Sequence, residues 1–309
     1  MGAGTTGPIF VGGDHRSGTT LVSLVLDSHP QLTVGPEIDF LEPINLGSHV
    51  LECCDLIESE DERVAGQGVQ TNDPAYGLGV QFVRQCHRFG VDLADLRHTV
   101  ARTVETTGSD LVSFRARCAL MNELGELRRT TTGSLRWGIK IQRSIGRASA
   151  FGAVWPSSQF VHVLRDGRDV AASQLRGSRG WGYESVEEAA CGWLEIVESR
   201  SLRRLGIRSH TLRYEDLVAE PATAARSLLR FLGLRWSEAV LRHDEAEHSL
   251  LRNPYEHPSA ETVSRPIYAD AVGRYRRDLS PSELAAFERI ARAALTRLGY
   301  SVAPSGGRD

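Results

Sequence analysis

The stretch Gly13-Asp14-His15-Arg16-Ser17-Gly18-Thr19-Thr20 has the glycine spacing of a phosphate-binding loop. In loops that bind nucleoside triphosphates, with the pattern G-x-x-x-x-G-K-[ST], the lysine reaches the β- and γ-phosphates and the hydroxyl residue holds Mg²⁺. Thr19 stands where that lysine would be. The loop therefore indicates a phosphorylated ligand other than ATP or GTP.

The residues on either side of this loop predict a strand before it and a helix after it. The apolar run from Pro8 to Gly13 is typical of a buried parallel strand, and Thr19 to Leu26 predicts a buried helix that ends at Asp27-Ser28-His29-Pro30. Such a turn aims backbone N–H groups and the positive end of a helix dipole at one point, which suits an anion. Arg16 adds charge, and hydroxyl groups come from Ser17, Thr19 and Thr20. The alternative is an ordinary glycine-rich turn, which leaves this coincidence of arginine and hydroxyls unexplained.

The composition is that of a soluble globular protein. Of 309 residues, 41% are hydrophobic and 24% are charged, and the net charge of -3 gives no reason to expect nucleic-acid binding. No stretch approaches about 18 consecutive apolar residues, and the N-terminus lacks a charged leader with an apolar core. We therefore expect no integral membrane segment. The oligomeric state is not readable from the sequence.

The cysteines are odd in number and scattered, and they form neither a C-x-x-C motif nor a ligand-spaced cluster with histidine. This usage predicts reduced thiols, a cytoplasmic location and no metal site. The residues concerned are Cys53, Cys54, Cys86, Cys118 and Cys191.

Strand and helix patterns alternate along most of the chain. This alternation predicts an α/β fold, with a P-loop-type parallel sheet flanked by helices on both faces in a single domain over residues 1–309. A largely helical insertion is expected at about 46–130, and a long loop at about 247–272. The expected strands are Ile9 to Val11, Leu32 to Val34, Trp137 to Ile141, Gln159 to Leu164 and His210 to Leu212. The clearest later helices are Ser185 to Leu205, Ala222 to Leu232 and Pro281 to Leu298.

Charged residues lie at or near the ends of several expected strands. Glu37 follows the second strand, Lys140 lies within the third, and Arg165 ends the fourth. Since ligands of parallel α/β sheets bind at the carboxyl ends of the strands, these groups and the phosphate loop are expected to meet at one edge.

The second strong motif follows the fourth strand. Arg165 is followed by Asp166-Gly167-Arg168-Asp169, and Ser173 lies eight residues after the arginine in the next helix. An arginine and a serine in this arrangement can bracket a further phosphate. Asp166, Arg168 and Asp169 are expected to form structural ion pairs.

With both motifs in view, the chain resembles sulfotransferases that use 3′-phosphoadenosine 5′-phosphosulfate (PAPS), nearest the tyrosylprotein-sulfotransferase-like branch. The resemblance implies that the R-S-G-T-T-L segment, here Arg16 to Leu21, is the 5′-phosphosulfate site, and that Arg165 and Ser173 bind the 3′-phosphate. It also implies that the catalytic glutamate is Glu37 and the catalytic lysine is Lys140. A donor without a γ-phosphate accounts for the missing loop lysine.

The resemblance extends to residues further along the chain. It implies that Tyr214, in Arg213-Tyr214-Glu215-Asp216-Leu217, lies near the nucleotide. Val263-Ser264-Arg265-Pro266 resembles the C-terminal loop that closes over the donor, so Arg265 is expected to contact it. The cofactor-binding set is thus Arg16, Ser17, Gly18, Thr19, Thr20, Arg165, Ser173, Tyr214 and Arg265.

The chain departs from the family pattern in ways that concern the acceptor. His15 replaces the usual proline before the loop arginine, and Asp39 stands where the tyrosylprotein branch often has arginine. Val34 and Gly138 replace paired cysteines of secreted-pathway members. These changes leave the acceptor open among small molecules, glycans, lipids and peptide tyrosines that carry a hydroxyl.

The resemblance predicts in-line transfer of a sulfuryl group to an acceptor hydroxyl, by analogy with phosphoryl transfer. Glu37 would act as the general base, and Lys140 and Arg16 would neutralise charge on the bridging oxygen, without a metal. Two alternatives are a P-loop nucleotide kinase with an altered loop and a catalytically silent nucleotide-binding regulator. Thr19 disfavours the kinase, and a base and a lysine at the site disfavour the regulator.

Overall fold

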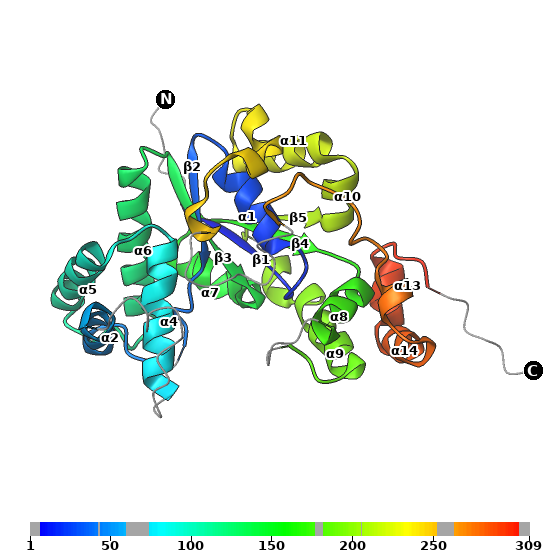
Figure 1. Ribbon diagram of the computed structural model, residues 1–309, viewed down its shortest axis with the longest axis horizontal. Coiled ribbons are helices and arrows are strands. Elements are labelled where there is room, and N and C mark those ends of the chain that lie inside the picture. The colour runs from blue at the N-terminus through cyan, green and yellow to red at the C-terminus, as the bar shows by residue number, and fades with distance from the viewer. Residues whose placement is uncertain are drawn as a thin grey trace, which may run out of the picture.

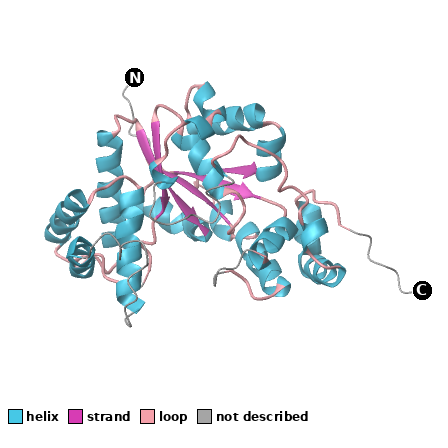
Figure 2. Cartoon of the chain, in the orientation of Figure 1, coloured by secondary structure: helices cyan, strands magenta, loops and turns pink. Residues whose placement is uncertain are grey.

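The computed structural model describes residues 7–42, 44–59, 74–176, 182–204, 206–251 and 263–302. In this part of the chain five strands form one sheet in the order β2-β3-β1-β4-β5, and all neighbouring strands are parallel. Figure 2 shows the sheet at the centre of the molecule with helices around it. The predicted α/β fold is confirmed. The strands are β1 (Ile9–Gly13), β2 (Leu32–Glu37), β3 (Arg136–Gln142), β4 (Gln159–Leu164) and β5 (Ser209–Arg213).

The strand order makes β1 the point at which the chain changes direction across the sheet. The chain passes from β1 to β2 and β3 on one side, and then crosses β1 to reach β4 and β5 on the other. In doubly wound sheets the crevice for ligands opens at the carboxyl end of this switch point. The phosphate loop, which follows β1 directly, therefore lies at the position where this topology places a ligand.

Both faces of the sheet are buried, as the near-continuous apolar strands require. Along β1, Phe10 points to one face and packs in a core with Trp137, Phe151 and Phe160. Ile9 and Val11 belong to a second core on the opposite face. The first face is covered by α2 (Ser48–Ser59), α4 (Pro74–Arg88), α5 (Leu93–Thr107), α6 (Phe114–Thr131) and α7 (Ala148–Val154). The second is covered by α1 (Thr19–Asp27), α10 (Tyr214–Ala219) and α11 (Pro221–Leu232).

A third group of helices packs beside the end of β4. This group contains α8 (Gly167–Leu175), α9 (Val186–Val197), α13 (Tyr275–Asp278) and α14 (Pro281–Arg297). It lies at the lower right in Figure 1, away from the helices of the insertion at the left. The loop after β1 lies between these two groups, so side chains from both can reach it.

The predicted strands are all present, and the helical character expected for the insertion is found in α2, α4, α5 and α6. The helix predicted over Ser185 to Leu205 is too long. Ser185 caps α9, but the helix ends at Val197, and a short 3₁₀ turn, η2 (Arg200–Arg203), follows. The apolar spacing that holds α9 against α8 and α14 stops at Val197, and the residues of η2 pack against α7 and the first core instead, so the helix is not prolonged.

The expected loop at about 247–272 is described only in part. Its described part includes the 3₁₀ turn η5 (Ser249–Leu251), and the described residues 263–272 form no strand. Residues 252–262, which include Asn253-Pro254 and His257-Pro258, lie outside the described residues.

Candidate active site

The phosphate loop is held in shape by its own hydrogen bonds. The Ser17 hydroxyl and backbone N–H both donate to the Asp14 carbonyl, at 2.7 and 3.2 Å. Ser17 is buried and does not line the cavity described below, so its side chain shapes the loop instead of pointing toward a ligand. Gly18 has φ of 100° and precedes α1, and a Cβ there would lie 2.5 Å from the Tyr214 ring. Glycine is therefore needed at this position both for the backbone angle and for the close approach of the ring.

The loop opens into a cavity of about 580 Å³ at the carboxyl edge of the sheet. This volume is in the range of small-molecule and cofactor sites. The cavity brings together nearly all of the predicted site residues, although they lie far apart in the sequence. These are Arg16, Gly18, Thr19, Thr20, Glu37, Lys140, Arg165, Ser173, Tyr214 and Arg265.

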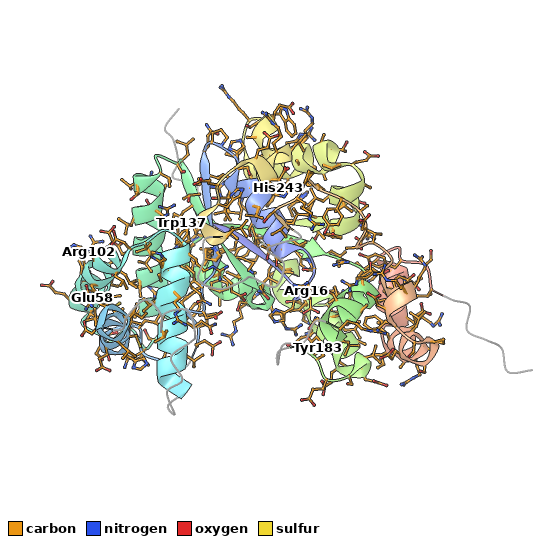
Figure 3. The ribbon with its side chains drawn as sticks, viewed as in Figure 1. Arg16, Glu58, Arg102, Trp137, Tyr183 and His243 are labelled. Carbon is orange, nitrogen blue, oxygen red and sulfur yellow. The ribbon has the colours of Figure 1, made fainter. Side chains whose placement is uncertain are left out.

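One end of the cavity carries the predicted 3′-phosphate residues. The Arg16 Nε donates to Ser173 Oγ at 3.0 Å, and Arg165 Nη1 donates to the Arg16 carbonyl at 2.9 Å. The Arg165 guanidinium lies over the Tyr214 ring, 4.5 Å from its centroid. Arg16 thus groups with Ser173 and Arg165, and Figure 3 shows it between the sheet and α8. Nearby guanidinium groups and burial lower the pKa of Arg16, with burial the larger cause.

Arg165 has one buried donor that the protein does not satisfy. Its side chain is 5% exposed, and its Nε lies buried without a hydrogen-bond partner in the described part of the chain. Its nearest carboxylate, on Asp169, is 3.9 Å away. A buried unpaired N–H beside two further arginines is an arrangement that favours a bound anion.

Sequence reasoning missed the arginines that follow residue 270. Arg274 Nη1 lies 3.5 Å from Ser173 Oγ, and both Arg274 and Arg277 line the cavity. The Asp169 carboxylate fixes this segment, because it accepts from the backbone N–H groups of Gly273 and Tyr275 at 2.8 and 3.0 Å. The run Gly273-Arg274-Tyr275-Arg276-Arg277, dense in arginine, was the available signal.

The expected ion pairs of the second motif are present. Arg168 pairs with Asp166 at 2.7 Å and with Glu288 of α14 at 2.6 Å, and Arg165 pairs loosely with Asp169. These contacts attach α14 to α8 and so support the helix that presents Ser173. The prediction that Asp166, Arg168 and Asp169 form structural ion pairs is confirmed.

At the other end of the cavity, Glu37 and Lys140 face each other. The Lys140 Nζ is 3.8 Å from Glu37 Oε2 and donates to Thr20 Oγ1 at 3.3 Å. Gln142 Nε2 donates to Glu37 Oε2. Lys140 is 5% exposed and is the only lysine in the sequence.

Pro36 produces this alignment. Gly35 pairs with Ile139 and Glu37 with Lys140, so the register shifts by one residue at the proline. Proline has no N–H to give to a ladder and is tolerated in strands only at edges and bulges. The shift brings Glu37 level with Lys140 at the end of β2, which is an edge strand.

Burial changes the protonation of this pair. It raises the pKa of Glu37 to about 7, against the opposing attraction of Lys140. It also lowers the pKa of Lys140, which the Glu37 carboxylate opposes. A carboxylate with a pKa near neutrality has the basicity that proton abstraction requires.

His15 is neutral at physiological pH. Burial lowers its pKa to about 4, and the positive charges of Arg143 and Lys140 act in the same direction. Arg143 in turn pairs with Asp14 at 2.6 Å and with Glu195 of α9 at 2.7 Å. The loop is thereby tied to α9.

The insertion contributes a wall of the cavity that sequence reasoning did not identify. Gln81, Gln85 and Arg88 of α4 line it beside Glu37. Their spacing of four and three residues places them on one helical face, and this polar stripe was the available signal.

Within the described residues, no helix is long and apolar enough to span a membrane, and no group of three His, Cys, Asp or Glu residues is arranged to hold a metal ion.

The fold and this site define a pocket suited to an anionic ligand such as a nucleotide. Comparison with known proteins gives the family. The model of the sulfotransferase family matches residues 8–238, well over half of the chain. The chain therefore belongs to the sulfotransferase family, and the predicted resemblance is confirmed.

The curated relatives carry the name of the branch predicted from the sequence. The chain is 25% identical over 280 residues to the protein-tyrosine sulfotransferase of Drosophila melanogaster, covering 86% of this chain and 46% of that protein. It is 23% identical over 304 residues to protein-tyrosine sulfotransferase 2 of Gallus gallus, covering 94% and 69%. The chain thus spans about half the length of the first relative and about two thirds of the second.

A solved structure has the same fold. The sulfotransferase domain from the Synechococcus PCC 7002 olefin synthase superposes with a TM-score of 0.61 at 17% identity, covering 98% of both chains. At this identity the likeness concerns the fold.

Proposed function

We propose that this protein transfers the sulfuryl group of PAPS to an acceptor hydroxyl. The observation that carries the proposal is the juxtaposition of Glu37 and Lys140, 3.8 Å apart, at one end of a cavity whose other end is lined by several arginines. A base beside a buried cation suits deprotonation of a hydroxyl, and the arginines suit a ligand with separate anionic groups.

The residues present fit the bisphosphorylated donor. The buried Arg165 Nε without a protein partner, together with Arg16, Arg274 and Ser173, supports binding of the 3′-phosphate. The N–H groups that open α1, with Thr19 and Thr20, support binding of the 5′-phosphosulfate. When bound, the donor supplies the activated sulfuryl group.

Glu37 accepts the proton of the acceptor hydroxyl. Gln142 orients the carboxylate, and burial keeps its pKa near the pH at which it works. Lys140, held by Thr20 Oγ1, stabilises negative charge that develops at the oxygen between phosphate and sulfur. Arg16, by its bond to Ser173, contributes mainly to donor binding, and its predicted catalytic role stays a prediction.

Calorimetry with adenosine 3′,5′-bisphosphate, followed by incubation with ³⁵S-labelled PAPS and cell extract, tests the proposal. We expect bisphosphate binding without Mg²⁺ and label transferred to an extract component. Binding of Mg²⁺-ATP with no binding of the bisphosphate would instead support the kinase alternative. Normal binding of the bisphosphate with no label transferred would support the silent regulator.

We also propose a cytoplasmic location, as the cysteine usage predicts. All five cysteines have free thiols, four of them buried. Fractionation of the source cells with an antibody to the protein tests this proposal, and recovery in a secreted or membrane fraction would contradict it.

A further inference from the structure

The cavity has an apolar part and a polar part, and different elements build them. Most apolar lining side chains belong to α1 or to residues 263–271, namely Leu21, Val263, Pro266, Ile267 and Ala271, and α10 adds the ring of Tyr214. The lining side chains that α4 and the end of β3 contribute beside Glu37, where the acceptor must sit, are all polar. We call Gln81, Gln85, Arg88 and Gln142 the polar wall.

The polar wall is held in a fixed arrangement before any acceptor binds. Asp39 accepts from the amides of Gln81 and Gln85, the latter at 2.6 Å, and its own N–H donates to Gln85 Oε1 at 2.8 Å. Arg88 donates to the Leu250 carbonyl through Nε and Nη2, at 3.2 and 2.8 Å. Asp39, which departs from the arginine often found in the tyrosylprotein branch, therefore orients two amides toward the cavity.

One acceptor atom of the wall is poorly satisfied. Gln142 uses its Nε2 on Glu37, while its buried Oε1 has no well-formed hydrogen bond in the described part of the chain and has only the His15 ring beside it. A side-chain amide both donates and accepts, and a hydroxyl does the same. An apolar alcohol or a phenol ring at this wall would find no apolar surface and would leave these groups unpaired.

From this arrangement we infer that the acceptor is a hydroxyl-rich molecule of the sugar or polyol type. This inference rests on the proposed sulfuryl transfer. One hydroxyl of the acceptor gives its proton to Glu37, and its oxygen attacks the sulfur atom. The new bond between this oxygen and sulfur forms while the bond from sulfur to the donor's phosphate oxygen breaks, and the bisphosphate leaves. Neighbouring hydroxyls exchange hydrogen bonds with Gln81, Gln142 and Arg88. Gln85 mainly holds Asp39 in place.

An acceptor panel with the full chain and ³⁵S-labelled PAPS tests the inference. The panel contains methyl glycosides, a disaccharide and inositol, against 4-nitrophenol, a long-chain alcohol and a tyrosine peptide. We expect the hydroxyl-rich members to have the highest kcat/KM. A preference for the phenol, the alkanol or the peptide would overturn the inference, as would failure of every member despite normal bisphosphate binding. Failure of the bisphosphate itself to bind would instead overturn the proposed function.

Variants of the polar wall separate recognition from folding. Gln81 is exposed at the cavity mouth, so Gln81→Leu should leave the fold intact. We expect it to raise the KM for the best hydroxyl-rich acceptor about tenfold, with kcat and bisphosphate affinity little changed. Gln81→Asn, which keeps an amide, should recover part of the loss. His87→Leu, on the same helix, exposed and outside the cavity, is the matched control. If the KM for the acceptor were unchanged both in Gln81→Leu and in Arg88→Leu, the assignment of acceptor binding to the polar wall would be overturned.

Discussion

Glu37 and Lys140 are register partners on adjacent parallel strands, with the carboxylate and ammonium groups 3.8 Å apart. The lysine that triphosphate-binding loops carry within the loop is replaced here by Thr19, and the cation comes from β3, where it contacts Thr20. The positive charge therefore reaches the loop from the side on which Glu37 lies. This position suits a reaction at the junction of donor and acceptor more than a grip on a terminal phosphate.

The pH dependence of turnover follows from this pair. Because the pKa of Glu37 is raised to about 7 and a base acts only when deprotonated, kcat/KM should rise as pH increases through about 7. Lys140 must be charged, and its pKa is lowered, so activity should fall again at alkaline pH. A pH profile of initial rates measures both limbs.

Two variants check the assignment of the acidic limb. Glu37→Gln should bind the bisphosphate normally and lose turnover at every pH, because no base remains. His15→Asn should retain the limb, since the pKa of His15 is lowered to about 4 and the ring is already neutral there. An acidic limb that vanishes in His15→Asn would reassign the base.

Replacement of Lys140 tests charge and shape together. Lys140→Met should lower kcat about 10²- to 10³-fold, the loss typical of one preorganised charge-stabilising group. Lys140→Arg should also be impaired, because a planar guanidinium does not fit the buried space between Thr20 and Glu37. Steady-state kinetics on both variants gives the values. Arg289→Lys, at an exposed position on α14, is the control for exchanging lysine and arginine. A wild-type kcat in Lys140→Met would show that Lys140 does not stabilise charge in the reaction.

Removal of Arg165 should weaken the nucleotide site specifically. Arg165→Ala should reduce the affinity for adenosine 3′,5′-bisphosphate by about 1–3 kcal/mol, through loss of charge-assisted hydrogen bonds. Affinity for adenosine 5′-phosphate should change much less, because that ligand lacks the 3′-phosphate. Calorimetry with the two nucleotides makes the comparison. Equal losses for both would place the 3′-phosphate elsewhere.

Gly18 should tolerate no side chain. In Gly18→Ala the added Cβ would meet the Tyr214 ring at 2.5 Å on a backbone with φ of 100°, so either the loop or the ring must move. We expect a loss of bisphosphate affinity of about 5- to 150-fold, from strain of about 1–3 kcal/mol. Gly233→Ala, with φ of 74° and open space around the Cβ, isolates the backbone cost. Unaltered nucleotide affinity in Gly18→Ala would show that this contact is unimportant.

The sequence was sufficient for the sheet and for most of the residues that line the cavity, because these depend on local signals. Apolar runs ending in glycine or charge marked each strand, and the carboxyl-edge rule then grouped Glu37, Lys140 and Arg165 correctly. The end of α9 at Val197 was not predicted, since it depends on where packing against α14 stops.

The missed residues of the site reach it through tertiary contacts. Arg274 comes to Ser173 because Asp169 binds the backbone beside it, and a hydrogen bond of that kind has no signature in sequence. Gln85 faces the cavity because α4 packs over the sheet, and its bond to Asp39 joins two segments without a shared motif. Ser17 was assigned to the ligand from its position in the motif, whereas its hydroxyl closes the loop.

The solitary lysine has a practical consequence. Biosynthetic incorporation of lysine labelled with ¹⁵N at Nζ would introduce isotope at one side-chain amine, that of Lys140, without modifying it. Its resonance could be followed during titration and nucleotide addition without competing signals from other lysines. The electrostatic state of the reaction centre is thus open to direct spectroscopic observation in the unmutated protein.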